Sequence, residues 1–253
     1  MQFASLGSGS RGNATVIRHE STIILVDCGF SLKETELRLA RIGLEAGQID
    51  AILVTHEHGD HIRGVGTFAR KHKTPVWMTH GTGRTAEIGV IPNGFEITIG
   101  EMVQLGDISV LPYSVPHDAT EPCQFLFSDG KLKLGLLTDT GMITPHIIEV
   151  LSGIDAILLE ANHDTGMLAN GEYPPSLKKR VAGDYGHLNN HQAAELLTKM
   201  DTSKLATIVV LHISDKNNDP ILAKQAIAEA IDWDTDDIHI AHQTDGFDWM
   251  SIN

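Results

Sequence analysis

Four side chains that can bind a metal ion lie close together in this sequence, at His56, His58, Asp60 and His61. The apolar run 51–54 directly before them predicts a buried strand that ends at the first histidine. Histidines two residues apart on an extended segment point to the same side, so His56 and His58 can bind one ion. Asp60 and His61 follow where the chain is expected to turn into a helix, within reach of a second ion. The spacing therefore predicts a site for two metal ions.

A two-metal site needs more ligands than one loop supplies, and three candidates follow apolar runs elsewhere in the chain. They are His117, Asp139 and His212. Each comes after a predicted strand, and the loops at strand ends are where such ligands can be gathered. Asp139 could bridge both ions. Imidazole and carboxylate ligands without a thiolate suit zinc or manganese, and iron is also compatible.

The rest of the sequence alternates short apolar strands with amphipathic helices, and no segment has the composition of a linker between domains. The pattern predicts helices over 31–42, 61–71, 190–200 and 220–231. It predicts strands over 23–26, 51–54, 76–78, 103–105, 108–115, 124–128, 133–137, 156–159 and 207–211. Mixed strands followed by alternating strands and helices favour two sheets packed face to face with helices outside. The expected fold class is α/β (α+β), a four-layer αβ/βα sandwich formed by one domain of residues 1–253.

Composition and charge limit the kinds of partner. Hydrophobic residues make up 42% of the chain and the formal net charge is -14, which argues against a broad basic surface for duplex nucleic acid. No apolar run reaches the roughly 18 residues that span a bilayer, and the N-terminus lacks the features of a signal peptide. The two cysteines favour a reducing compartment, and Cys28 is expected to be a buried thiol. We therefore expect a cytoplasmic protein with no membrane contact and no evident obligate protein partner.

The histidine run, the segment Thr138-Asp139-Thr140-Gly141 and the two isolated histidines together resemble the metallo-β-lactamase superfamily, over essentially the whole chain. The resemblance implies that the first metal ion is held by His56, His58 and His117. It implies that the second is held by Asp60, His61 and His212, with Asp139 between the two ions.

Two adjacent cations lower the pKa of a water between them, so the expected reaction is hydrolysis by a metal-bridging hydroxide, which Asp60 can orient. The segments 5–13, 160–164, 173–174 and 186–189 resemble the YycJ/WalJ group of this superfamily. That resemblance implies 5′-to-3′ exonuclease action on DNA. The expected function is therefore a phosphodiesterase that acts on the ends of single-stranded DNA or RNA.

Three residues outside the ligand set are candidates for supporting or catalytic roles. Asp27 follows an apolar strand and, by the same resemblance, matches an acid that hydrogen-bonds a ligand histidine and fixes its tautomer. Its other interpretation is an ordinary acid at a strand end. His163 and His187 precede the last ligand candidate in the sequence. They are expected to contact the reacting phosphate, or else to be supporting or surface histidines.

Two further segments are candidates for binding the substrate. Lys179 and Arg180 belong to a basic triplet on an expected helix, which could steer a phosphate backbone or simply face solvent. Ser8, Ser10 and Asn13 lie in a turn rich in hydroxyl and amide donors. This turn could donate hydrogen bonds to a terminal phosphate, as backbone nests do, or be a plain hairpin turn.

Two other classes of function share parts of this pattern. A glyoxalase-II-like thioesterase would share the metal ligands, but it needs a basic patch late in the chain for glutathione, and no strong one follows residue 216. A redox module with a di-iron site usually comes with a flavodoxin-like domain, for which this chain has no room. A non-catalytic metal-binding role disagrees with the complete set of core ligands.

Overall fold

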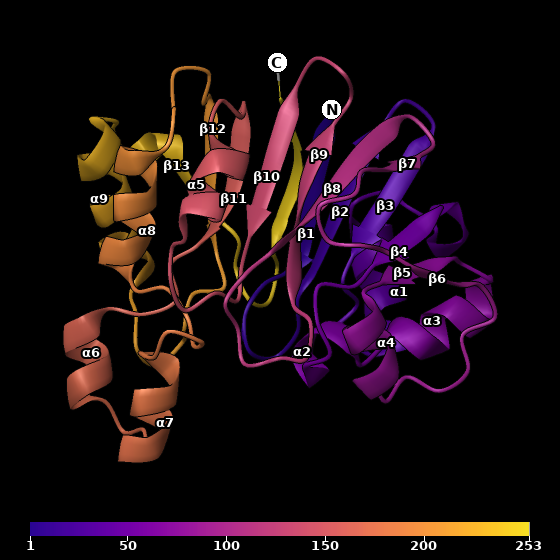
Figure 1. Ribbon diagram of the computed structural model, residues 1–253, viewed down its shortest axis with the longest axis horizontal. Helices are drawn as coiled ribbons and strands as arrows, with labels where there is room; N and C mark the ends of the chain where they lie inside the picture. The colour runs from indigo at the N-terminus through magenta and orange to yellow at the C-terminus, as the bar shows by residue number, and fades with distance from the viewer. Residues whose placement is uncertain (253) are drawn as a thin grey trace.

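Short, strongly apolar segments form two sheets that pack face to face in the computed structural model, which describes residues 1–252. Over those residues each sheet has seven strands, and helices cover the outer faces (Figure 1). The molecule is thus a four-layer sandwich of helices, sheet, sheet and helices. The predicted fold class is confirmed. The extent of the domain, residues 1–253, stays a prediction.

The first sheet is antiparallel on one side and parallel on the other. Its neighbours from β14 to β3 run antiparallel, and those from β3 to β6 run parallel. In spatial order its strands are β14 (Phe247–Ser251), β1 (Gln2–Gly7), β2 (Ala14–His19), β3 (Thr22–Val26), β4 (Ala51–Leu53), β5 (Val76–Met78) and β6 (Gly94–Glu96).

The second sheet has the same division. Its strands from β10 to β13 run parallel, and those from β7 to β10 run antiparallel. In spatial order they are β13 (Ile238–Ile240), β12 (Thr207–Leu211), β11 (Ala156–Glu160), β10 (Lys133–Leu137), β9 (Cys123–Ser128), β8 (Ile108–Ser114) and β7 (Val103–Leu105).

The helices fall into three sets. Next to the first sheet lie α1 (Leu32–Arg41), α2 (Gly59–Ile62), α3 (Val65–His72), α4 (His80–Thr85) and the 3-10 turn Ala46–Gln48. Against the second sheet lie α5 (Pro145–Leu151), α8 (Asn190–Lys199), α9 (Pro220–Ile231) and the 3-10 turn Thr235–Asp237. Beyond the ends of the sheets stand α6 (Thr165–Asn170) and α7 (Pro175–Val181) (Figure 1). Within the described residues, no helix combines the length and apolar content needed to cross a membrane.

Burial on both faces explains why the strands read as continuous apolar runs. The five residues of β11 are all buried because Leu158 packs between the sheets while Leu159 packs under α5 and α8. The layer between the sheets includes Phe3, Phe125 and Phe127, all fully buried. A strand covered on both faces shows no alternation of polar and apolar residues.

The sequence located most of these elements, and one helix prediction is wrong. The expected helix over 61–71 is broken into α2 and α3 at Arg63 and Gly64. There the Gly64 N–H donates to the Cys28 carbonyl oxygen (2.7 Å), and a Cβ on Gly64 would lie 2.2 Å from the Phe30 carbonyl oxygen. The chain passes so close to the loop after β3 that a continuous helix does not fit. Cys28 is buried, as predicted.

Candidate metal centre

The seven ligand candidates come from four loops and the short helix α2, which meet at one edge of the sandwich. His56 and His58 follow β4, Asp60 and His61 lie in α2, and the other three follow β8, β10 and β12. In two of these loops the ligand candidate itself has a left-handed backbone, with φ of 51° at Asp139 and 54° at His212. This conformation is costly for residues other than glycine and is found mainly at functional sites. It turns the chain sharply as each strand ends.

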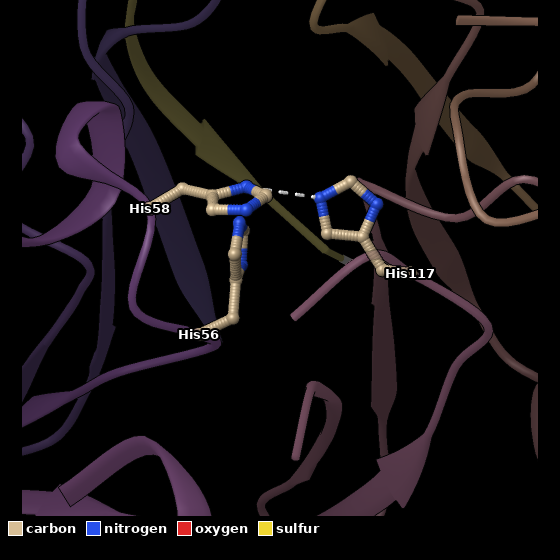
Figure 2. A group of neighbouring side chains, drawn as sticks. All are labelled: His56, His58 and His117. Atoms are coloured by element: carbon tan, nitrogen blue, oxygen red, sulfur yellow. Dashed lines mark hydrogen bonds between the residues drawn. The ribbon is translucent and has the colours of Figure 1, made fainter. Parts of the chain in front are cut away.

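His56, His58 and His117 form the first group of ligand candidates. One nitrogen atom of each lies within 4.8 Å of the others, and the rings face one another across a small gap (Figure 2). The shortest contact joins His58 Nδ1 to His117 Nε2, at 3.2 Å.

The second group consists of Asp60, His61 and His212, which also offer atoms within 4.8 Å of one another. Asp139 lies between the two groups. Its carboxylate oxygens are 3.3 Å from His61 Nε2, 3.4 Å from His212 Nδ1 and 3.9 Å from His117 Nε2. The sequence-based placement of Asp139 between two sites therefore has a counterpart in the structure.

Hydrogen-bond acceptors outside the centre occupy one nitrogen of each histidine in the first group. His56 Nδ1 faces Thr55 Oγ1 (3.0 Å), whose own proton goes to Asp27. His58 Nε2 faces the Asp118 carbonyl oxygen (3.2 Å), and His117 Nδ1 faces the Gly186 carbonyl oxygen (3.1 Å). Because each acceptor takes the ring proton, the other nitrogen of each ring carries a lone pair.

Carboxylates do the same for the two histidines of the second group. Asp27 Oδ2 lies 2.7 Å from His61 Nδ1, and Glu160 Oε1 lies 3.0 Å from His212 Nδ1. Asp27 also accepts hydrogen bonds from the Thr55 backbone and hydroxyl. The structure places Asp27 where a residue that orients a ligand histidine must lie. Its role in metal binding stays a prediction.

This arrangement fits divalent cations. Among the described residues, His56 Nε2 and His212 Nε2 are buried and have no hydrogen-bond partner. His58 Nδ1 and His117 Nε2, both left with lone pairs, face each other at 3.2 Å, where two acceptors repel unless a positive charge lies near them. Imidazole nitrogens and carboxylate oxygens are ligands that zinc and manganese accept. The donor set is thus one that a cation would complete.

The direction of the pKa shifts differs between the histidines of the first group and those of the second. Burial lowers the pKa of His56 and His117 in the first group, so these rings are neutral. In the second group burial also disfavours the charged form of each ring, but Asp139 and its neighbouring carboxylates outweigh the effect of burial. They raise the pKa of His61, and they raise the pKa of His212 to about 10. Against the effect of burial, His61 holds the pKa of Asp60 well below its usual range. The second group therefore has the stronger local attraction for positive charge.

Glu160 is a residue that the sequence analysis did not assign. It is fully buried at the end of β11, and its carboxylate accepts hydrogen bonds from His187 Nδ1 (2.8 Å) and His212 Nδ1 (3.0 Å). The backbone N–H groups of Thr140 and Leu188 donate to its other oxygen. Neighbouring His187 holds the pKa of Glu160 down, to about 2, although burial alone would raise it. The sequence did contain a signal for Glu160, because it is the last residue of an apolar strand. Asp139 and His212 were recognised because they follow the ends of apolar strands in the same way.

The two histidines expected to be catalytic lie in different surroundings. His187 lines the cavity beside the two groups, and its ring centroid is 5.1 Å from that of His212. The described residues that line this cavity do not include His163, which is buried. Burial lowers the pKa of His163 to about 4. Only His187 is therefore in a position to touch a substrate directly.

The N-terminal turn lies against the metal centre, with only its tip exposed. Ser8 Oγ accepts a hydrogen bond from the His212 backbone N–H (3.0 Å), and Asn13 Nδ2 lies 3.2 Å from Asp60 Oδ2 and 3.0 Å from His61 Nε2. Ser8 and Asn13 are thus already engaged with ligand candidates. Ser10 is exposed and lines the cavity, so it remains available to a substrate.

The cavity next to the two groups has a volume of about 370 Å³. Arg180 lines it and donates from Nε to Asp118, whereas Lys179 is exposed on α7 and is not one of the described residues that line it. The other lining residues include Asp60, Asp139, Asn162, Tyr173 and Ser214. The cavity thus brings Asp60 and Asp139 together with an arginine that can bind an anion.

Comparisons with known proteins agree with this geometry. The model of the beta-lactamase superfamily domain matches residues 22–213. An exodeoxyribonuclease YycJ of Bacillus anthracis is 37% identical over 92% of this chain and 89% of its own length. An exodeoxyribonuclease WalJ of Streptococcus pneumoniae is 33% identical over 91% of this chain and 88% of its own length. The crystal structure of the metallo-beta-lactamase fold protein YhfI from Bacillus subtilis superposes with a TM-score of 0.76 at 14% identity, covering 98% of each chain. That likeness concerns the fold alone.

Proposed function

Because the chain belongs to the metallo-β-lactamase superfamily, we propose that this metal-dependent hydrolase is a nuclease that uses two metal ions to release nucleotides from the 5′ end of single-stranded DNA. The observation that carries the proposal is the arrangement of five histidines, each with one nitrogen held by an outside acceptor. Of the second nitrogens, His56 Nε2 and His212 Nε2 are buried without a hydrogen-bond partner. The two exodeoxyribonucleases that resemble most of the chain support DNA as the substrate.

The first group would hold one divalent ion and the second group the other, with Asp139 between them. Zinc and manganese suit these ligands, and iron is also compatible. Bound there, the ions would lower the pKa of a water molecule and stabilise negative charge on the scissile phosphate.

The role of Asp60 is to orient the attacking water. Its side chain is 24% exposed and lines the cavity, so a water in the cavity can reach it. The lowered pKa keeps the carboxylate ionised, and an ionised carboxylate only accepts hydrogen bonds. Asn13 Nδ2 donates a hydrogen bond of 3.2 Å to Asp60 Oδ2 and holds that oxygen in place. Asp60 thus offers a fixed acceptor for a proton of the water.

His187 has a separate role on the substrate side of the cavity. Since His187 Nδ1 donates to Glu160, Nε2 is the nitrogen left for the substrate, and it donates to a phosphate oxygen when the ring carries a second proton. The ring is 21% exposed at the cavity wall, which is open enough to contact a phosphate oxygen. We assign this contact to His187. His163 does not line the cavity, so we assign it only an indirect role. Ser10 and Arg180 supply further donors to a phosphate at the cavity mouth.

The test is degradation of a 5′-phosphorylated single strand by the purified protein. DNA and RNA of the same sequence are incubated with added manganese or zinc, with a chelator, and with the Asp60→Ala variant. Stepwise release of nucleotides that stops with chelator and with Asp60→Ala is the expected result. Glu195→Ala, on the exposed side of α8, is the matched control and retains full activity.

The outcomes separate the parts of the proposal. Cleavage of RNA in preference to DNA would replace the substrate but keep the reaction. Internal cuts in place of stepwise release would overturn the exonuclease assignment. Absence of any phosphodiester cleavage with either metal would remove the nuclease proposal and make thioesters the next substrates to assay.

A further inference from the structure

A projecting segment stands beside the metal centre and has no part in the fold of the sheets. Residues 164–187, here called the α6–α7 arm, carry α6 and α7 beyond the ends of the strands (Figure 1). The arm returns to the centre at its end, where Gly186 and His187 line the cavity. The Asp118 N–H also donates to the Tyr185 carbonyl oxygen (3.0 Å), which ties the arm to the loop of the first group.

The charge of the arm differs from that of the rest of the molecule. The chain has a net charge of -14, but the arm contains three basic residues, all on α7, and three acidic ones. The net negative charge therefore lies entirely outside the arm. Arg180 and Lys179 are exposed near the cavity, and Lys216 approaches it from the loop after β12. A polyanion that reaches the centre along the arm therefore meets no net negative charge from the arm itself.

The arm also presents aromatic rings, which are scarce on this protein's surface. Tyr173 lines the cavity, and the Lys216 ammonium lies 6.0 Å from the centre of its ring. Tyr185 is 64% exposed, and among the described residues Phe95 on β6 is the only other large aromatic side chain that is classed as exposed. Exposed rings next to cations are the combination that proteins use to bind unpaired bases.

The size of the cavity requires such a surface if the substrate is a strand. A volume of about 370 Å³ lies near the lower end of the roughly 300–1,000 Å³ that small-ligand pockets occupy. It can hold a terminal nucleotide but not the nucleotides that follow. These must lie on the surface outside the cavity. There Arg180 and Tyr173 line the cavity wall, and the exposed Tyr185 precedes the lining residue Gly186.

We infer that the α6–α7 arm is the binding surface for the single strand beyond the reacting nucleotide, with Tyr173 and Tyr185 stacking on bases and Arg180 and Lys179 contacting phosphates. This inference rests on the proposed nuclease function and adds residues that determine its preference for unpaired strands. Stacking requires free base faces, which a duplex does not offer. Arg180, which pairs with Asp118 in the free protein, exchanges that carboxylate for a phosphate.

Binding is measured separately from cleavage. The Asp60→Ala variant, with manganese in the buffer, is titrated against a fluorescein-labelled, 5′-phosphorylated strand of twelve thymidines, and anisotropy gives Kd. Adding Tyr173→Ala or Tyr185→Ala to this background raises Kd by at least about fivefold, the lower range for loss of one stacked base. Tyr185→Phe keeps the ring and the affinity. Phe95→Ala removes another exposed ring, on β6, and leaves Kd unchanged, with thermal unfolding as a check that each variant is folded.

Cleavage by the otherwise unmodified enzyme provides the second readout. KM for the wild type falls as the strand lengthens from two to twelve nucleotides, and Tyr185→Ala removes most of this fall. If the strand binds and the tyrosine variants bind it equally well, the arm has no such role and only this inference fails. If the strand binds through the arm but no metal supports cleavage, the proposed function fails while the binding surface stands. If the strand neither binds nor is cleaved, both are overturned.

Discussion

The first and second groups of ligand candidates are built from the same residue type but are supported by different acceptors. In the first group, neutral oxygens hold the histidines, namely the Thr55 hydroxyl and the carbonyls of Asp118 and Gly186. In the second group, the buried carboxylates of Asp27 and Glu160 do so. A carboxylate fixes the tautomer as a carbonyl does, but it also adds a negative charge and makes the ring a stronger donor to a metal.

This difference predicts unequal affinities for the two ions. The second group combines Asp60 with the two supporting carboxylates, whereas the nearest side-chain carboxylate to the first group, that of Asp118, is already paired with Arg180. We expect the second group to hold its ion more tightly. Substitutions at the supporting residues should therefore act unequally on the two ions, and the following variants test this in order of decreasing effect.

Asp139→Ala should have the largest effect, because the Asp139 carboxylate lies within 3.9 Å of histidine nitrogens of both groups. We expect both ions to bind more weakly and hydrolysis to fall by more than the roughly 10- to 100-fold that loss of a supporting residue costs. Elemental analysis of the dialysed protein and the rate of nucleotide release are the measurements. A variant that keeps two tightly bound ions would show that the groups do not share this carboxylate.

Glu160→Gln should come next. Glu160 accepts four hydrogen bonds, two on one oxygen from His187 and His212 and two on the other from backbone N–H groups. An amide has only one acceptor oxygen, so either the two rings or the two N–H groups then face an NH2 donor. We expect a loss of activity of about 10- to 100-fold with selective weakening of one of the two ions. Glu229→Gln, exposed on α9, is the control and changes neither quantity. Equal weakening of both ions would contradict the division into two groups.

Glu160 also illustrates what the sequence could and could not predict. Strands β3 to β5 and β7 to β12, α1 with its N-cap Ser31, and the convergence of His56, Asp139 and His212 follow from apolar runs and from what comes after them. These features are local, so their sequence signal is strong. Glu160 ends an apolar strand too, but its role depends on two histidines from other loops, and that dependence leaves no local signature.

The first two strands and the break between α2 and α3 were missed for a related reason. The Ser5–Gly7 part of the expected N-terminal turn lies in β1, where it pairs with β2 and the distant β14. The break at Gly64 depends on contact with the loop after β3, more than thirty residues earlier in the chain. Both are set by long-range packing, which local periodicity does not record.

Asp27→Asn tests the other carboxylate that supports the second group and should have a smaller effect than Glu160→Gln. Asp27 supports one ligand histidine, and its remaining hydrogen bonds go to Thr55. An asparagine can still accept from the Thr55 backbone or from His61, so we expect a loss near the lower end of the 10- to 100-fold range. Weaker binding of the more tightly held ion, measured by competition with a chelator, should account for this loss of activity. Weakening confined to the other ion would reverse the assignment of Asp27.

Thr55→Val should have the smallest effect and is the counterpart on the first group. The hydroxyl donates to the Asp27 carboxylate (Oδ2, 2.9 Å), to which the Thr55 backbone N–H still donates after the substitution. It accepts from the ligand candidate His56 (Nδ1, 3.0 Å) in a hydrogen bond between two neutral groups. A hydrogen bond of this kind contributes about 0.5–1.5 kcal/mol, which corresponds to a change of about two- to tenfold in metal affinity. The weaker ion should bear most of that change, and Thr55→Ser should restore it. If Thr55→Val instead cost as much as Glu160→Gln, neutral acceptors would support ligand histidines as strongly as carboxylates do, and the unequal affinity of the two groups would lose its physical basis.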